Sequence, residues 1–102
     1  MKYEMDPEIS GLIVFKPDIF YDVRGEYVNT FNTEDYAFLN EEFLEDDFSI
    51  SRRGVLRGLH GDSKTKKLIQ CIHGSILLAV ADLRGQSPTY LETRLYAIND
   101  KN

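Results

Sequence analysis

The sequence predicts an all-β fold that contains one short helix. From residue 48 onward, runs rich in Val, Ile, Leu and Tyr alternate with polar residues, which is typical of half-buried strands. Turn signals separate these runs about every 8–12 residues, a spacing that indicates a sandwich or barrel of antiparallel strands. The only convincing helical pattern covers residues 32–43.

Length and composition limit what the chain can be. Its 102 residues, 42% of them hydrophobic, fit a single globular domain. Because 12 Lys and Arg face 17 Asp and Glu, for a net charge of −5, we expect no nucleic-acid partner. One cysteine and two histidines leave little material for a disulfide or a metal site. No apolar run approaches about 18 residues and residues 1–10 lack an apolar segment, so we expect neither membrane association nor a secretory signal, and a cytoplasmic location.

The first third of the chain predicts a strand and a hairpin. Residues 1–10 are polar, and we expect a loose arm there. An apolar strand over Leu12–Phe15 follows and is ended by Pro17, which cannot donate a ladder hydrogen bond. Arg24 and Gly25 then separate two runs of Tyr, Phe and Val, which predicts a hairpin with Gly25 at a positive φ.

The helix and the later strands follow in order. Asn32 or Thr33 can cap a helix of about two turns over residues 32–43, with acidic residues in its first turn. A tight hairpin is expected at Gly74, and a turn at the RGQSP segment. The strands expected after the helix cover residues 48–51, 55–60, 66–73, 75–83 and 89–98.

The densest polar cluster inside apolar sequence is the segment VLRGLHGDSKTKKL, which contains Arg57 and His60. In a regular strand two residues three apart face opposite sides, but Gly58 between them permits a bulge that brings both to one surface. Two interpretations stay open from these residues alone. Either the pair belongs to a functional site, or this is an edge strand with a solvated Arg57 and a His60 bonded to backbone.

The spacing after His60 resembles the metal-binding motif of cupins, but its contents differ. Asp62 stands where the second histidine ligand is expected, Lys67 replaces the glutamate, and Gly74 keeps its place. A protonated lysine cannot coordinate a divalent cation, so we expect no metal. A neutral imidazole beside an ammonium instead suits proton abstraction next to a ketone, with the ammonium stabilising the oxyanion that forms.

Several motifs in order resemble the dTDP-4-dehydrorhamnose 3,5-epimerase family. They are FYDVRGEY, the S-x-S of Ser49 and Ser51, VLRGLH, and DLR followed by SPTY, and the resemblance runs from about Gly11 to Ile98. The resemblance implies a cupin-type jelly roll without metal or cofactor, forming a homodimer. It also implies epimerisation of a nucleotide-linked 4-keto-6-deoxy sugar for surface-polysaccharide biosynthesis, through an enolate beside the ketone.

The resemblance also assigns roles to particular residues. His60 corresponds to the catalytic base, and Lys67 to the lysine that stabilises the enolate. Arg57 corresponds to the arginine that holds the diphosphate, and Arg24 to a residue that reaches the nucleotide bound by the partner subunit. The remaining expected substrate contacts are Ser51 and Asn29.

Three positions depart from the family pattern. Asp62 replaces a glutamine, Asn29 replaces a glutamate, and residues 45–47 are Glu-Asp-Asp instead of Gln-x-Asn. The HGD-x-K-T-x-KL form resembles a branch that epimerises GDP-linked keto sugars. The alternatives are therefore an epimerase of a GDP-linked sugar or of one carbon only, and a non-catalytic module that binds sugar nucleotides or another protein.

Length is the largest departure, because family members are nearly twice as long. We therefore expect residues 1–102 to form one domain that is the N-terminal part of an epimerase jelly roll. In the family the tyrosine that acts as general acid and the aspartate that orients the base lie in the other half.

Overall fold

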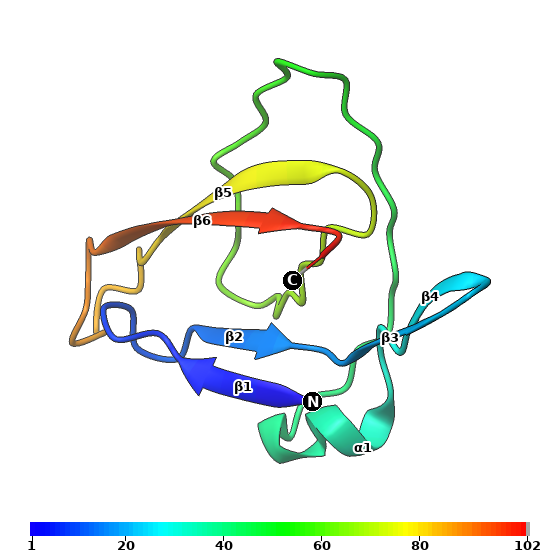
Figure 1. The fold of residues 1–102 in the computed structure, drawn as a ribbon. Coiled ribbons are helices and arrows are strands. Elements are labelled where there is room, and N and C mark those ends of the chain that lie inside the picture. The colour runs from blue at the N-terminus through cyan, green and yellow to red at the C-terminus, as the bar shows by residue number, and fades with distance from the viewer. Residues whose placement is uncertain (102) are drawn as a thin grey trace.

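The computed structural model describes residues 1–101, and its strands pair antiparallel in three separate two-stranded sheets (Figure 1). The prediction of an all-β chain with one short helix is confirmed. The sheets are formed by β1 (Lys2–Met5) with β2 (Ile13–Lys16), β3 (Ile19–Asp22) with β4 (Gly25–Val28), and β5 (Ser75–Ala81) with β6 (Thr93–Asn99). The helix α1 covers Thr33–Tyr36 and continues into a 3₁₀ turn, Ala37–Leu39.

The N-terminal segment is a strand, so the expectation of a loose arm over residues 1–10 is wrong. Strand β1 pairs with β2 in a register that places Tyr3 opposite Phe15. Ile9, which follows in the connecting turn, is buried. The charges that make this segment look disordered alternate with Tyr3 and Met5, and alternation is the pattern of a strand. The expected strand at Leu12–Phe15 is confirmed with a shift of one residue.

The largest apolar cluster packs the short helix against β1 and β2. Tyr3 stacks on Phe38 with ring centroids 4.5 Å apart, and Phe15 meets the ring of Tyr36 edge-on at 4.9 Å. Phe31 also stacks on Tyr36, with ring centroids 5.2 Å apart. Tyr36 is buried, so this aromatic cluster is the core that joins the helix to the first hairpin.

The helix begins where the sequence predicts and ends earlier. The Asn32 side-chain oxygen accepts a hydrogen bond from the Asp35 N–H at 2.8 Å, as an N-cap does. Asn40 then adopts a positive φ of 53°, which ends the 3₁₀ turn. The helix predicted over residues 32–43 is therefore too long, because the helical conformation ends at Leu39.

Residues 40–74 contain no helix or strand and are almost entirely exposed, and they form the long loop, mostly green, in Figure 1. The strands expected at 48–51, 55–60 and 66–73 are therefore wrong. Their alternation is real, but a strand needs a partner for its backbone groups, and these segments pair with nothing in residues 1–101. The runs at 75–83 and 89–98 do contain strands, because β5 and β6 pair with each other, but β6 begins only at Thr93 and residues 89–91 form a turn.

A buried carboxylate joins the first hairpin to the last one. The side chain of Asp6 has no exposed surface and accepts hydrogen bonds from Arg94 Nε at 2.8 Å and from the Tyr96 hydroxyl. It also accepts from the backbone N–H of Ile9 at 2.8 Å and that of Glu8 at 2.8 Å. Burial alone would raise the pKa of Asp6, but these hydrogen bonds outweigh burial and lower that pKa below its usual range.

A second buried carboxylate organises the turn between β5 and β6. Asp82 accepts from Arg84 Nε at 2.8 Å, Ser87 Oγ at 2.6 Å and Thr89 Oγ1 at 2.7 Å. Arg84 also donates to the Ser10 carbonyl, and the Ser10 N–H donates to Thr89 Oγ1 at 3.0 Å. The hydrogen bonds from Arg84 and then Ser87 hold the pKa of Asp82 well below its usual range. The DLR and SPT motifs therefore act together as one structural unit.

The described part of the chain contains no helix able to cross a membrane; α1 has only four residues.

Candidate functional site

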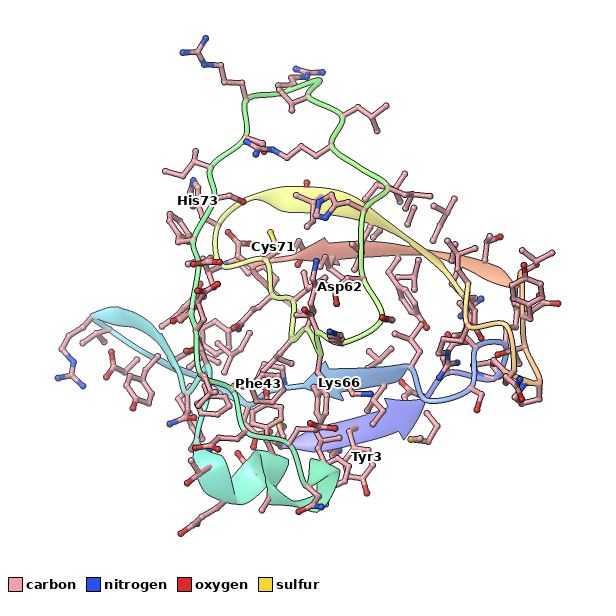
Figure 2. The ribbon with its side chains drawn as sticks, turned by 180° about the vertical axis from the view of Figure 1, so that it is seen from behind. Tyr3, Phe43, Asp62, Lys66, Cys71 and His73 are labelled. Atoms are coloured by element: carbon pink, nitrogen blue, oxygen red, sulfur yellow. The ribbon has the colours of Figure 1, made fainter. Side chains whose placement is uncertain are left out.

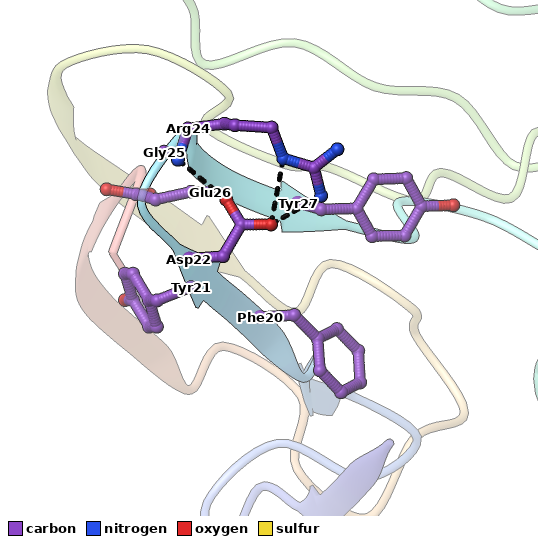
Figure 3. Close-up of a pocket in the computed structure, with 7 residues that line it drawn as sticks. All are labelled: Phe20, Tyr21, Asp22, Arg24, Gly25, Glu26 and Tyr27. Carbon is purple, nitrogen blue, oxygen red and sulfur yellow. Dashed lines mark hydrogen bonds and ion pairs between the residues drawn. The ribbon is translucent and has the colours of Figure 1, made fainter.

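Arg24 lies at the turn of the β3–β4 hairpin, which confirms the predicted hairpin (Figure 3). Gly25 has φ of +131°, a conformation that favours glycine. The Asp22 carboxylate accepts from the Arg24 backbone N–H at 2.8 Å and from its Nε at 3.0 Å. These hydrogen bonds from Arg24 lower the pKa of Asp22. The guanidinium is thereby held over one face of the hairpin.

Two exposed aromatic rings share this face with Arg24. Phe20 and Tyr27 are opposite each other in the β3–β4 register and are 62% and 67% exposed. Figure 3 shows both rings on the side of the Arg24 guanidinium, with Tyr21 on the other side of the hairpin. Side chains of this hairpin, Phe20, Tyr27 and Arg24 among them, line an open hollow of about 520 Å³. Sequence reasoning missed Phe20 and Tyr27; the signal that finds them is strand alternation counted outward from the turn.

Asn29 belongs to the base of the same hairpin. Its side-chain oxygen accepts from Asn32 Nδ2 at 3.0 Å, and Asn32 caps the helix. The position expected to contact substrate is therefore tied to the aromatic cluster through the helix cap. Glu26 on β4 forms an ion pair with Lys101, which follows β6, so the hairpin also contacts the end of the last strand.

Arg57 and Ser51 come together in the long irregular segment. Arg57 Nε donates to Ser51 Oγ at 2.9 Å, and its Nη2 donates to the Ile50 carbonyl at 3.3 Å. Two of the residues expected to bind substrate are thus a hydrogen-bonded pair. A guanidinium anchored through Nε keeps its remaining donors available to an anion.

His60 lies two residues after Gly58, a glycine with a positive φ. Gly58 has φ of +91°, and a Cβ added there would lie 3.3 Å from the His60 backbone nitrogen and 3.4 Å from its ring. The position therefore disfavours any side chain both conformationally and sterically. The glycine expected to permit a change of chain direction thus has a conformation that favours glycine. The imidazole of His60 is exposed, and it forms no hydrogen bond or ion pair with residues 1–101.

Lys67 and Asp62 interact within the loop that follows His60. The positive charge of Lys67 contributes to lowering the pKa of Asp62, after hydrogen bonds from the Lys64 N–H and from Thr65. Figure 2 labels Asp62, which appears in that view between the β5–β6 hairpin and the β1–β2 hairpin. The Asp62 carboxylate is directed into its own turn.

The expected site residues thus fall into two groups in the described structure. Arg24 and Asn29 lie on or beside the β3–β4 hairpin, and Ser51, Arg57, His60 and Lys67 lie on the irregular segment 40–74. In residues 1–101 no three His, Cys, Asp or Glu side chains gather in a way that would hold a metal ion.

Comparison with known proteins identifies the family of this all-β chain. A sequence profile of the dTDP-4-dehydrorhamnose 3,5-epimerase family matches residues 6–102, and the chain belongs to that family. No solved structure gives a significant match.

Relatives with this name extend the comparison. The dTDP-4-dehydrorhamnose 3,5-epimerase of Methanothermobacter thermautotrophicus is 37% identical over 98 residues, which are 92% of this chain and 53% of the relative. The enzyme of the same name from Shigella flexneri is 36% identical over 89 residues, 81% of this chain and 49% of the relative. The chain therefore spans about half the length of these curated relatives.

Proposed function

We propose that this chain provides the base and the anion-binding residues of an epimerase acting on a nucleotide-linked 4-keto-6-deoxy sugar. The observation that carries the proposal is the family match over residues 6–102, a range that contains both His60 and Lys67. The relatives that match are named for the dTDP-linked sugar. A dTDP-linked substrate is accordingly the first candidate.

The chemistry follows from the acidity of the carbons that flank a ketone. The imidazole of His60 takes the proton from such a carbon, and the electron pair moves to the ketone oxygen as an enolate. The ammonium of Lys67 stabilises that oxyanion. A proton from solvent is delivered to the opposite face, which inverts the carbon and restores the ketone, and His60 releases its own proton to solvent. The reaction is therefore redox-neutral and needs no cofactor.

The anionic part of the substrate is assigned to the arginines. Arg57, pre-oriented by Ser51, binds the diphosphate through its remaining N–H groups. Arg24 with Phe20 and Tyr27 presents a cation beside two exposed rings, a combination that suits a nucleobase and its phosphates. Because these groups lie on different parts of the chain, a homodimer in which Arg24 serves the partner's substrate fits the arrangement. A cytoplasmic location and a role in surface-polysaccharide synthesis are part of the same proposal.

The test is solvent exchange. The protein is incubated in D₂O with a dTDP-linked 4-keto-6-deoxy sugar, and deuterium at the carbons beside the ketone is followed by NMR. We expect incorporation that His60→Ala abolishes, while His73→Ala, which changes the chain's other histidine, leaves it unchanged.

Binding without exchange by the unmodified protein would instead support the non-catalytic module. Deuterium at a single carbon would identify a one-carbon epimerase, and exchange confined to a GDP-linked substrate would identify the GDP branch. Exchange that survives in His60→Ala would overturn the assignment of the base.

A further inference from the structure

In the sequence, Asp62 lies between His60, the proposed base, and Lys67, the residue proposed to stabilise the oxyanion. His60 precedes it by two residues and Lys67 follows it by five. Whatever shapes this short segment sets where Lys67 lies relative to His60. The contacts of Asp62 therefore bear on the reaction even though its side chain has no role in the proposed chemistry.

Both carboxylate oxygens of Asp62 are engaged within the loop. Oδ1 accepts the backbone N–H of Lys64 at 2.8 Å and that of Thr65 at 2.7 Å. Oδ2 accepts the Thr65 hydroxyl at 2.8 Å. An aspartate that bonds the N–H groups two and three residues ahead forms an Asx-type turn, which fixes the backbone locally.

The carboxylate is also an unsuitable ligand for the substrate. Its hydrogen bonds to Lys64 and Thr65, together with the charge of Lys67, lower its pKa, so it is ionised at neutral pH. An ionised carboxylate repels a diphosphate, and the two oxygens already have three partners. Asp62 thus has the contacts of a residue that shapes the loop.

We propose that Asp62 is a positioning residue that holds the 62–65 turn and thereby sets Lys67 relative to His60. This inference rests on the proposed epimerase function. It predicts that Asp62 acts on the rate of proton transfer through Lys67 and leaves the choice of nucleotide unchanged.

Three variants separate the parts of the turn. Asp62→Ala removes every contact, Asp62→Asn keeps the Oδ1 acceptor for both N–H groups, and Thr65→Val removes only the hydroxyl. Ser63→Ala is the matched control, because it lies in the same turn and its side chain makes no hydrogen bond to residues 1–101. Urea unfolding of each variant verifies that it folds like the unmodified protein.

The readout is the deuterium-exchange rate measured against concentration for dTDP- and GDP-linked 4-keto-6-deoxy sugars. We expect Asp62→Ala to lower kcat by about 10- to 100-fold, the size of effect that a misplaced catalytic group causes, with KM changed less than about threefold. Asp62→Asn should retain most of the activity, Thr65→Val should fall between, and Ser63→Ala should match the unmodified protein.

Two results would overturn the inference. An unchanged kcat in Asp62→Ala would show that the turn does not position Lys67. A change in nucleotide preference, with Asp62→Asn as impaired as Asp62→Ala, would show that the charge of Asp62 selects the substrate. Failure of the proposed function is a separate result, because the unmodified protein would then show no exchange with either sugar.

Discussion

Removing the ring of Tyr36 tests whether the aromatic cluster holds the helix against the first hairpin. Tyr36 is buried between Phe31, stacked at 5.2 Å, and Phe15, edge-on at 4.9 Å. Each aromatic pair contributes about 0.5–1.5 kcal/mol beyond area burial, so Tyr36→Leu should lose about 1–3 kcal/mol. Tyr36→Ala should cost more, about 3–5 kcal/mol, which is comparable to the whole stability of a small domain.

The assay is urea unfolding followed by far-UV circular dichroism. With a denaturant slope of about 1–2 kcal/mol per molar urea, the loss of about 1–3 kcal/mol in Tyr36→Leu should lower the midpoint by about 0.5–3 M. Tyr36→Phe should stay close to the unmodified protein, because the Tyr36 hydroxyl makes no hydrogen bond to residues 1–101. Tyr27→Leu, at a position 67% exposed, is the matched control and should shift the free energy of unfolding by less than about 0.5 kcal/mol. Equal shifts for Tyr36→Leu and Tyr27→Leu would refute the cluster as the core.

Three further predictions concern charge and hydrogen bonding. The pKa of Asp82 is lowered in the folded chain, so the stability that this carboxylate contributes is fully present above its unfolded pKa of about 3.9 and is lost progressively as the pH falls below that value. Urea midpoints measured from pH 7 to pH 3 should therefore drop less steeply in Asp82→Asn than in the unmodified protein, and an equal drop in both would contradict this. Ser51→Ala should weaken binding of a nucleoside diphosphate about two- to tenfold by releasing Arg57, whereas Ser49→Ala should not; equal affinities by calorimetry would remove Ser51 from that role. Glu26→Gln breaks the ion pair to Lys101, and its effect on the urea midpoint should disappear at 1 M NaCl because salt screens exposed pairs; an effect that persists in salt would point to another cause.

Local signals in the sequence predicted the parts of the fold that need only neighbouring residues. The strand before Pro17, the hairpin at Gly25 and the helix cap at Asn32 all depend on contacts within a few residues. Arg24 was therefore placed correctly at the turn of its hairpin, whereas Asn29 lies one residue beyond the end of β4.

Long-range pairing was not predictable in this way. The alternating segment 48–60 has the composition of strands, yet alternation says nothing about which strand lies alongside it. The bonds from Arg94 and Tyr96 to Asp6 join residues about ninety positions apart, and no local pattern announces them. The hydrogen bond from Arg57 to Ser51 spans only six positions, but it was also not predicted, because each residue was expected to contact the substrate separately.

The hydrogen-bond networks around Asp6 and Asp82 join the first and last hairpins independently of the peptide chain between them. Arg94 holds the first hairpin to the last one through Asp6, and Arg84 holds it through the Ser10 carbonyl, while residues 40–74 lie outside both contacts. Backbone cleavage inside 40–74, a segment rich in exposed arginine and lysine, would therefore leave two fragments still joined without a peptide bond. The segment that carries the proposed base can therefore be cleaved while the first and last hairpins stay bound to each other.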